Sequence, residues 1–187
     1  VSTSDEAINV VEKIIGYEQK PPTSSAFYHN GLHCTYFQDN NRDSYEDARF
    51  TLTSEDVRTY VMSKGKSIQR IYNAPSIVTP LYWNKFYTWD TTIPIPDELK
   101  KPAFPWDGND VKIRNSINNG VFYVLHRGHG YVSYWADPFY SHNDISELSN
   151  GNLLPVVFSI NCKTGKFDEN CLSETFLRKS NGGCVAI

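Results

Sequence analysis

The stretch VFYVLHRGHG occupies residues 121–130 and decides how the fold is read. Its first six residues form an apolar run of the length of one buried strand, and such runs are typical of parallel sheets covered on both faces. The strand is followed at once by glycines and histidines, which favour a sharp turn and a side chain that titrates near neutral pH. Functional residues collect at the carboxyl ends of parallel strands, so the sequence predicts a site at His126 and His129.

A second apolar run, LLPVVFSIN at residues 153–161, is followed by Cys162. If the two strands are neighbours, His129 and Cys162 face one another at the edge of the sheet. A thiolate is a strong nucleophile, and an adjacent imidazole supplies the base and acid that acyl transfer needs. Gly130 lets its backbone N–H point at a substrate carbonyl, where it could form an oxyanion hole with the N–H of Cys162.

The spacing of these residues leaves two other interpretations open. A cysteine after an apolar strand is often only a buried thiol. His126 and His129 could instead be two ligands of a zinc ion, with Cys162 as the third. The residues alone therefore allow a Cys/His dyad, a set of structural residues or a metal site.

The rest of the chain alternates short apolar strands with helical patterns. This alternation predicts the α/β class, with a mostly parallel sheet and helices on both faces. The first predicted helix carries apolar side chains at Ala7–Ile15 and is capped by Ser4 or Asp5, and a later helix begins with a capping box from Thr53 to Asp56. Further helices are expected at 107–120 and 171–183, and further strands at 31–37, 67–72 and 184–187.

Residues 74–106 interrupt this rhythm with six prolines and three tryptophans. Such a composition predicts a long insertion loop pinned by aromatic side chains. Two interpretations remain open: the insertion is a surface flap that covers core, or it is a wall of the substrate site.

Composition limits what the chain can be. A length of 187 residues suits a single domain, and a net charge of −3 gives no electrostatic reason to expect nucleic acid or an anionic membrane as partner. No apolar run approaches the roughly 20 residues of a membrane helix. The final residues, GGCVAI, read as a strand in mid-course, so we expect residues 1–187 to be a fragment of a longer protein. Cys34 and Cys184 are expected to be buried free thiols.

The second half of the chain resembles the catalytic half of the gingipain family of cysteine peptidases, which share the caspase-like fold. The resemblance rests on a co-linear set of residues. It comprises Gly128-His129-Gly130, Trp135, Leu154-Pro155, Cys162, Gly165, Phe167, Cys171 and Glu174. It extends weakly upstream into the first helix and into GLHCTYFQDNN at 31–41, and it omits the insertion.

This resemblance implies a three-layer caspase-like fold with Cys162 and His129 as the catalytic dyad. In the family an acidic residue from the loop after the early strand orients the histidine, and a gapless alignment from Cys34 places Asp39 there. Asp43 and Asp47 share that loop. Trp135 and His126 are expected to be substrate-binding residues. His126 stands where the family has no fixed catalytic residue, so a structural role is its alternative. Cys171 opens a helix and is expected to be a packed thiol.

The implied function is a cysteine endopeptidase that hydrolyses peptide bonds through a thioester acyl-enzyme. The alternative is a catalytically idle caspase-like module used for binding or for processing secreted proteins. The resemblance implies a secreted or cell-surface bacterial protein with protein or peptide substrates, and a further segment or chain that completes the sheet and the specificity pocket. A preference for Arg or Lys does not carry over, because the corresponding position falls near Phe50. No catalytic metal is expected. The acidic loop could offer oxygen ligands to a structural calcium ion, and its composition is equally that of a solvated loop.

Overall fold

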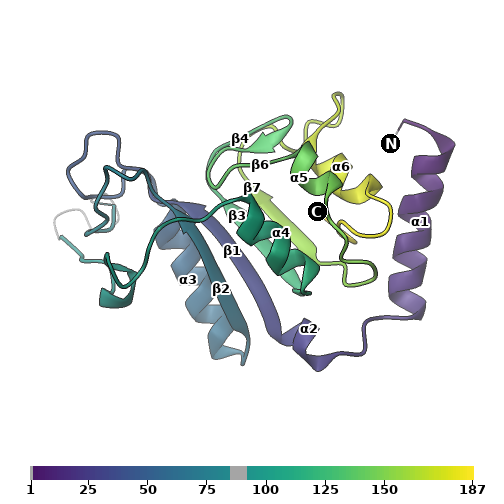
Figure 1. Ribbon diagram of the computed structural model, residues 1–187, viewed down its shortest axis with the longest axis horizontal. Helices are drawn as coiled ribbons and strands as arrows, with labels where there is room; N and C mark the ends of the chain where they lie inside the picture. The colour runs from purple at the N-terminus through teal and green to yellow at the C-terminus, as the bar shows by residue number, and fades with distance from the viewer. Residues whose placement is uncertain (1, 85–91) are drawn as a thin grey trace.

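A computed structural model describes residues 2–84 and 92–187, and its centre is a four-stranded parallel sheet (Figure 1). The strand order is β2-β1-β3-β7, and every neighbouring pair runs parallel. The strands are β1 (Asn30–Tyr36), β2 (Ser67–Asn73), β3 (Tyr123–Arg127) and β7 (Val156–Ile160). The predicted parallel sheet is confirmed, and the strands that precede the two candidate catalytic residues, β3 and β7, are direct neighbours.

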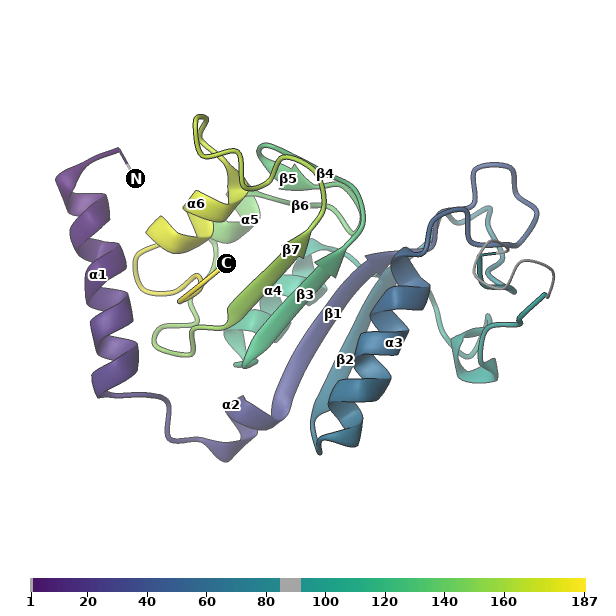
Figure 2. The ribbon, with the colours of Figure 1, turned by 180° about the vertical axis from the view of Figure 1, so that it is seen from behind.

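Helices lie on both faces of this sheet, as the sequence predicts. On one face lie α4 (Asp110–Asn118), α5 (His142–Ser146) and α6 (Leu172–Arg178). On the other face α3 (Phe50–Ser63) packs mainly on β1 and β2 (Figure 2). The main core lies on the α4–α6 side, where alternate strand residues meet the helices. Its fully buried members include Leu32, Val124, Trp135, Tyr140, Ile145, Leu172 and Phe176.

The start of α3 differs from the sequence prediction. The helix begins at Phe50, one turn before the predicted capping box at Thr53. The helix starts earlier because a side chain outside it provides the hydrogen-bond acceptor for its first turn. The buried carboxyl group of Glu46 accepts from the backbone N–H of Thr51 at 2.5 Å and of Leu52 at 3.3 Å. Because these first-turn amides are already satisfied, the helix needs no cap at Thr53.

The described part of the insertion, residues 74–84 and 92–106, covers the carboxyl ends of β1 and β2. It contains a 3₁₀ turn, Asp97–Leu99, and it packs a second, smaller core against the sheet. That core comprises Phe37, Leu52, Tyr72, Ala74, Val78, Trp83, Ile95, Leu99 and Trp106. Trp106 is fixed by a hydrogen bond from its Nε1 to the carbonyl oxygen of Leu99. Of the predicted pinning tryptophans, Trp89 lies outside the described residues. The insertion therefore covers core, and its part in substrate binding stays a prediction.

A three-stranded antiparallel sheet sits beyond the carboxyl end of β3 and was not predicted. It consists of β4 (Gly130–Tyr131), β5 (Tyr134–Trp135) and β6 (Tyr140–Ser141). Each strand has only two residues, which is too short for an alternating pattern to stand out in the sequence. This small sheet carries Trp135 back over the main core.

The first helix, α1 (Ser4–Gln19), lies at the edge of the molecule beside α6 (Figure 1). Its capping box is formed by Thr3 and Glu6, one residue before the caps that the sequence suggests. Polar side chains attach it, since Asn9 and Lys13 donate to backbone carbonyls at the end of α6. Its apolar residues remain exposed, namely Ile8, Val11, Ile14 and Ile15. A short helix, α2 (Ser25–His29), then leads into β1. No helix among residues 2–84 and 92–187 is long and apolar enough to cross a membrane.

The last residues run along the free edge of β7, as expected for a further strand. Ala186 forms a parallel bridge with Val156, and the N–H of Val157 donates to the carbonyl oxygen of Ala186 at 2.9 Å. The segment is one bridge long, so the predicted strand at 184–187 is confirmed only at this pair.

Candidate active site

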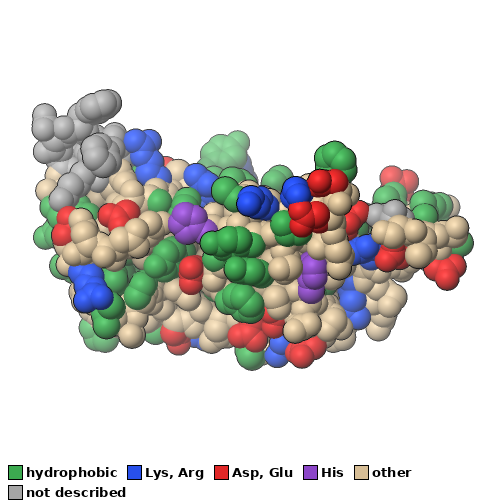
Figure 3. Space-filling model, turned by 90° about the horizontal axis from the view of Figure 1, so that it is seen from above, with side chains coloured by type: hydrophobic (Ala, Val, Ile, Leu, Met, Phe, Trp, Pro, Cys, Tyr) green, Lys and Arg blue, Asp and Glu red, His purple; other side chains and the backbone are tan. Residues whose placement is uncertain are grey.

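The candidate nucleophile and base meet because their strands are paired in register. Arg127 at the end of β3 lies opposite Ile160 at the end of β7. His129 follows Arg127 by two residues and Cys162 follows Ile160 by two, so both stand at the same level above the sheet. Both side chains are exposed. Figure 3 looks down on this edge, where histidine and hydrophobic side chains share the surface.

Gly130 shows how closely the two loops approach. A Cβ atom at this position would lie 2.5 Å from Oδ1 of Asn161 and 3.0 Å from the backbone oxygen of Cys162. No larger residue fits there without a shift of the Cys162 loop, so the glycine after His129 is a requirement of close packing. The contact brings the backbone of the His129 turn onto the Cys162 turn. The use of the N–H groups of Gly130 and Cys162 as an oxyanion hole stays a prediction.

The imidazole of His129 is held by residues from β1 and α3. Its Nε2 lies 2.7 Å from Oε1 of Gln38, a residue two positions beyond the end of β1. The edge of the Phe50 ring meets the histidine ring at a centroid distance of 5.0 Å, and the two planes are nearly perpendicular. The guanidinium of Arg127 lies over the ring of Phe50 in a cation–π contact, 5.1 Å from its centroid. The sequence analysis did not identify Gln38 or Phe50 as partners of His129, although Gln38 is the residue before Asp39, the predicted orienting acid.

Asp39, the predicted orienting acid, makes different contacts. Its two carboxylate oxygens accept from the backbone N–H groups of Asp43 at 3.1 Å and Ser44 at 2.9 Å, and the side chain is buried. Among the hydrogen bonds of the described residues, the bond to His129 comes from Gln38 and not from Asp39. The structure thus corrects the expected direct contact: Asp39 shapes the loop that carries Gln38. Its effect on catalysis stays a prediction.

His126 and Trp135 are fully buried, which corrects their expected role as substrate-binding residues. Their rings are stacked, with centroids 4.5 Å apart and planes 4° from parallel. Burial lowers the pKa of His126 to about 3, so the ring is neutral. A side chain with no exposed surface cannot line a substrate groove, and the structural alternative for His126 agrees with its environment.

His126 instead braces the turn that carries Cys162. Its Nδ1 accepts from Nδ2 of Asn161 at 2.7 Å, while its Nε2 lies 3.2 Å from the carbonyl oxygen of Asp137. Oδ1 of Asn161 in turn accepts from Thr164 at 2.6 Å. The network joins the turns on both sides of the candidate nucleophile. Asn161 was missed from the sequence because an amide before a cysteine carries no distinctive signal.

The four cysteines divide into one exposed and three buried thiols. Burial raises the pKa of Cys34 strongly and that of Cys184 to about 12, as expected for inert thiols. Cys171 is buried at the start of α6, which agrees with its prediction as a packed thiol. Cys162 alone combines exposure with a neighbouring histidine turn.

The zinc alternative does not fit the arrangement of the described residues. Among residues 2–84 and 92–187, no group of three or more His, Cys, Asp or Glu side chains could hold a metal ion. Both ring nitrogens of His126 are engaged in hydrogen bonds inside the protein. In the acidic loop, carboxylates of Asp39 and Asp47 accept from backbone amides. A structural calcium ion stays an untested prediction.

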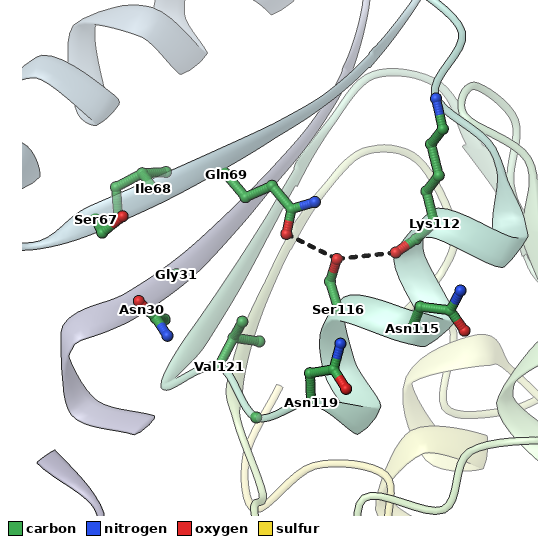
Figure 4. Close-up of a pocket in the computed structure, with 11 residues that line it drawn as sticks. Asn30, Gly31, Ser67, Ile68, Gln69, Lys112, Asn115, Ser116, Asn119 and Val121 are labelled. Carbon is green, nitrogen blue, oxygen red and sulfur yellow. Dashed lines mark hydrogen bonds between the residues drawn. The ribbon is translucent and has the colours of Figure 1, made fainter. Parts of the chain in front are cut away.

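A polar cavity of about 460 Å³ lies at the opposite end of the sheet, between α4 and the amino ends of β1 and β2 (Figure 4). Ser116 bridges its walls, donating to Oε1 of Gln69 and lying 2.9 Å from the carbonyl oxygen of Lys112. Amide and hydroxyl groups dominate its lining. It contains no cysteine or histidine, so it is separate from the candidate active site in both position and chemistry.

The parallel α/β fold places a cysteine and a histidine at the ends of adjacent strands, an arrangement that a cysteine peptidase requires. Comparison with protein families agrees: the model of Peptidase family C25 matches residues 1–187, and the chain belongs to this family. A 73-residue stretch is 29% identical to Gingipain R2 of Porphyromonas gingivalis and covers 38% of this chain and 10% of that protein. Gingipain R1 of that species is also 29% identical over 73 residues, which cover 38% of this chain and 7% of that protein.

Solved structures show the same fold. The crystal structure of the Arg-specific cysteine proteinase gingipain R superposes with a TM-score of 0.67 at 17% identity, covering 99% of this chain and 37% of that one. The complex of Porphyromonas gingivalis RgpB pro- and mature domains gives 0.67 at 15% identity, covering 100% and 38%. This chain therefore spans little more than a third of the solved structures that it matches. The predicted family and the caspase-like fold are confirmed.

Proposed function

We propose that the protein is a cysteine endopeptidase in which Cys162 is the nucleophile and His129 the general base. The observation that supports this most directly is the exposure of both side chains at the same level of two paired parallel strands. Membership of Peptidase family C25 supports the reaction class.

The proposed reaction has two halves. The thiol proton of Cys162 passes to His129, and the sulfur attacks the scissile carbonyl carbon to give a tetrahedral oxyanion. The N–H groups of Gly130 and Cys162 stabilise that charge. As the C–N bond breaks, the imidazolium returns the proton to the leaving amine, which leaves a thioester on Cys162. Water, activated by His129, then hydrolyses the thioester and releases the acid product.

The test is the Cys162→Ala variant of the full-length protein, assayed on a peptide library. We expect cleavage to fall to background while the thermal midpoint stays unchanged, because an exposed sulfur contributes little to packing. Cys171→Ala is the control: its thiol is buried, so stability falls and activity per folded molecule remains. Wild-type protein that folds but cleaves nothing would favour the idle-module alternative.

Alkylation provides a second arm that needs no substrate. Native protein treated with iodoacetamide should be labelled at Cys162 well before Cys34, Cys171 or Cys184, because those three are buried. Mass spectrometry of tryptic peptides measures the order. Equal labelling of all four thiols in folded protein would contradict an accessible, activated nucleophile.

We also propose that a further protein segment covers the open half of the sheet and completes the substrate site. Beside α3, the outward face of β3 and β7 forms an apolar groove of about 560 Å³. Its lining includes Val57, Tyr60, Leu125, Phe158 and Ile160. Apolar surface of this kind marks an interaction site. Residues 1–187 produced alone should bind a hydrophobic dye and aggregate, whereas a longer native chain should not. A soluble, dye-free monomer of 1–187 would refute this.

The remaining expectations follow from the family. We propose protein or peptide substrates and a secreted or cell-surface location in a bacterium, as the gingipain resemblance implies. Immunoblots of culture supernatant and surface-shaved cells, with a cytoplasmic marker as control, test the location.

A further inference from the structure

We infer that Gln38 is a positioning residue that selects the tautomer of His129 and thereby makes Nδ1 the atom that exchanges protons with Cys162. The inference rests on the proposed function for its catalytic consequence, and on the hydrogen bond between Gln38 and His129 for its structural basis.

Gln38 reaches His129 because β1 and β3 are paired in the sheet. Thr35 lies opposite Arg127, so the residues just past these two strand ends share one edge. The bond between Oε1 of Gln38 and Nε2 of His129 measures 2.7 Å. Gln38 thus approaches the imidazole from β1, whereas Cys162 stands at the end of β7 on the other side of β3.

The loop around Gln38 is built to hold this side chain in place. The backbone oxygen of Gln38 accepts from the N–H of Asp47 at 2.7 Å, and the N–H of Phe37 donates to the carbonyl oxygen of Asn73 at 2.9 Å. The carboxylate of Asp39 closes the same loop by accepting two backbone amides. The backbone of Gln38 is therefore anchored on both sides, which sets the position from which its side chain reaches His129.

The chemistry of an amide oxygen decides the tautomer. An oxygen of this kind only accepts hydrogen bonds, so the nitrogen that faces it must carry the hydrogen. With Nε2 protonated, the lone pair of the neutral ring resides on Nδ1. No protein partner for Nδ1 occurs among the hydrogen bonds of the described residues. Nδ1 is thus the ring atom left to accept the thiol proton of Cys162.

A neutral partner also differs from the carboxylate that the resemblance predicts. Nε2 keeps its hydrogen in both the imidazole and the imidazolium, so Gln38 holds the ring through the whole proton transfer. It adds no negative charge that would favour the imidazolium. Arg127 lies over the ring of Phe50, close to this imidazole. Asp137 is also close: burial raises the pKa of its carboxyl, and the charge of His129 lowers it. Asp39 is the next residue after Gln38, and His126 lies buried in β3.

The first test is the tautomer itself, read by ¹⁵N-edited NMR of the histidine rings in the full-length protein. We expect the Nε2–H form for His129 in the wild type and a mixture of forms in Gln38→Leu. The Nδ1–H form in the wild type, or an unchanged spectrum in Gln38→Leu, would overturn the inference. This readout needs no turnover, so it stands or falls independently of whether Cys162→Ala abolishes cleavage.

The second test is kinetic and uses a matched pair. Gln38→Leu should lower kcat by about 100-fold with little change in KM, the order of effect expected when a reacting group is misplaced. Gln38→Glu restores the acceptor and adds a charge, so it should recover most of kcat and move the titration of the His129 ring to higher pH. Gln69→Glu is the control: it makes the same change at the far end of β2, where Oε1 accepts from Ser116, and should leave both readouts unchanged.

Thermal midpoints accompany every variant, since a fall in kcat has meaning only for folded protein. If Gln38→Leu unfolds, Gln38→Glu still decides the matter. A folded Gln38→Glu protein in which the His129 titration does not move would show that the two side chains are not in contact in solution, and the inference would be lost.

Discussion

His126 lies in β3 and His129 lies just beyond the end of that strand, and these two histidines differ in burial and in contacts. His126 is fully buried, stacked on Trp135 and kept neutral by desolvation. His129 is exposed, and its imidazole forms a hydrogen bond with Gln38 in a neighbouring loop. The same residue type therefore has two roles: His126 supports the structure from inside the protein, and His129 is a candidate general base at the exposed end of the sheet. The difference teaches that the direction in which a residue leaves the strand, and not its type, decides its role.

The most direct test of whether these two histidines have different roles is to make the same substitution at both positions. His129→Gln should lower kcat about 1000-fold through loss of the base, with the free energy of unfolding unchanged. His126→Gln should reverse the pattern, destabilising the protein while activity per folded molecule is retained. Peptide hydrolysis and urea denaturation measure the two quantities. Equal activity losses in both variants would mean that burial does not separate the two roles.

The partner of the buried histidine should matter most for stability. Trp135 has no exposed surface, packs on Tyr140 and Phe176, and donates to Ser159 at 2.8 Å. Trp135→Ala should therefore reduce the free energy of unfolding by about 3–5 kcal/mol, the range for large aromatic truncations in a core. Tyr131→Ala on the adjoining exposed strand is the control, with an expected change within about 0.5 kcal/mol. A small effect at Trp135 would contradict its place in the core.

The dependence of stability on pH is a further test of the burial of His126. The pKa of His126 is about 3 in the folded protein and about 6.5 when unfolded, because burial disfavours the charged ring. The unfolded state then binds more protons between these values, so this contribution to stability is full above pH 6.5 and is lost as pH falls toward 3. Buried His33, with a pKa of about 4, acts in the same direction.

Urea denaturation at pH 7, 5 and 4 measures this slope. His126→Gln should flatten it relative to the wild type. An identical slope in the two proteins would show that His126 is not a buried neutral histidine.

The smallest expected effect concerns Asp39, one step removed from the imidazole. Asp39→Asn keeps one acceptor oxygen and loses the other, so the loop that holds Gln38 should loosen. We expect kcat to fall by less than about tenfold and stability by about 1 kcal/mol, the typical worth of one hydrogen bond. Steady-state kinetics of Asp39→Asn, Asp43→Asn and Asp47→Asn compare the three acids of the loop. A larger effect at Asp43 or Asp47 would show that another acid governs this loop.

The sequence was sufficient for the parts of the fold that repeat a pattern. Apolar runs predicted β1, β2, β3 and β7. The pairing of β3 with β7 was only a condition in the sequence analysis, and the structure shows it. Cys162, His129 and Gly130 carried a signal because they belong to the co-linear set of residues that resembles the gingipain family, whereas a cysteine after a strand is by itself often only a buried thiol.

Other features depend on contacts between distant residues, which no local pattern records. Glu46, which lies outside α3, accepts from a backbone N–H of the first turn of that helix. Gln38 bonds to His129, which lies 91 positions away in the sequence. The burial of His126 and Trp135 results from the small sheet β4–β6, whose strands are too short to predict. In each case tertiary geometry, not local preference, assigned the residue its place.

The attachment of α1 has a consequence for motion. The helix is held on its polar side by Asn9 and Lys13, while Ile8, Val11 and Ile15 stay exposed. A helix without a buried apolar face can open without the cost of exposing core, so its local opening free energy lies well below that of the sheet. In hydrogen–deuterium exchange on the full-length protein, the amides of α1 should therefore exchange orders of magnitude faster than those of β1, which is buried between β2 and β3.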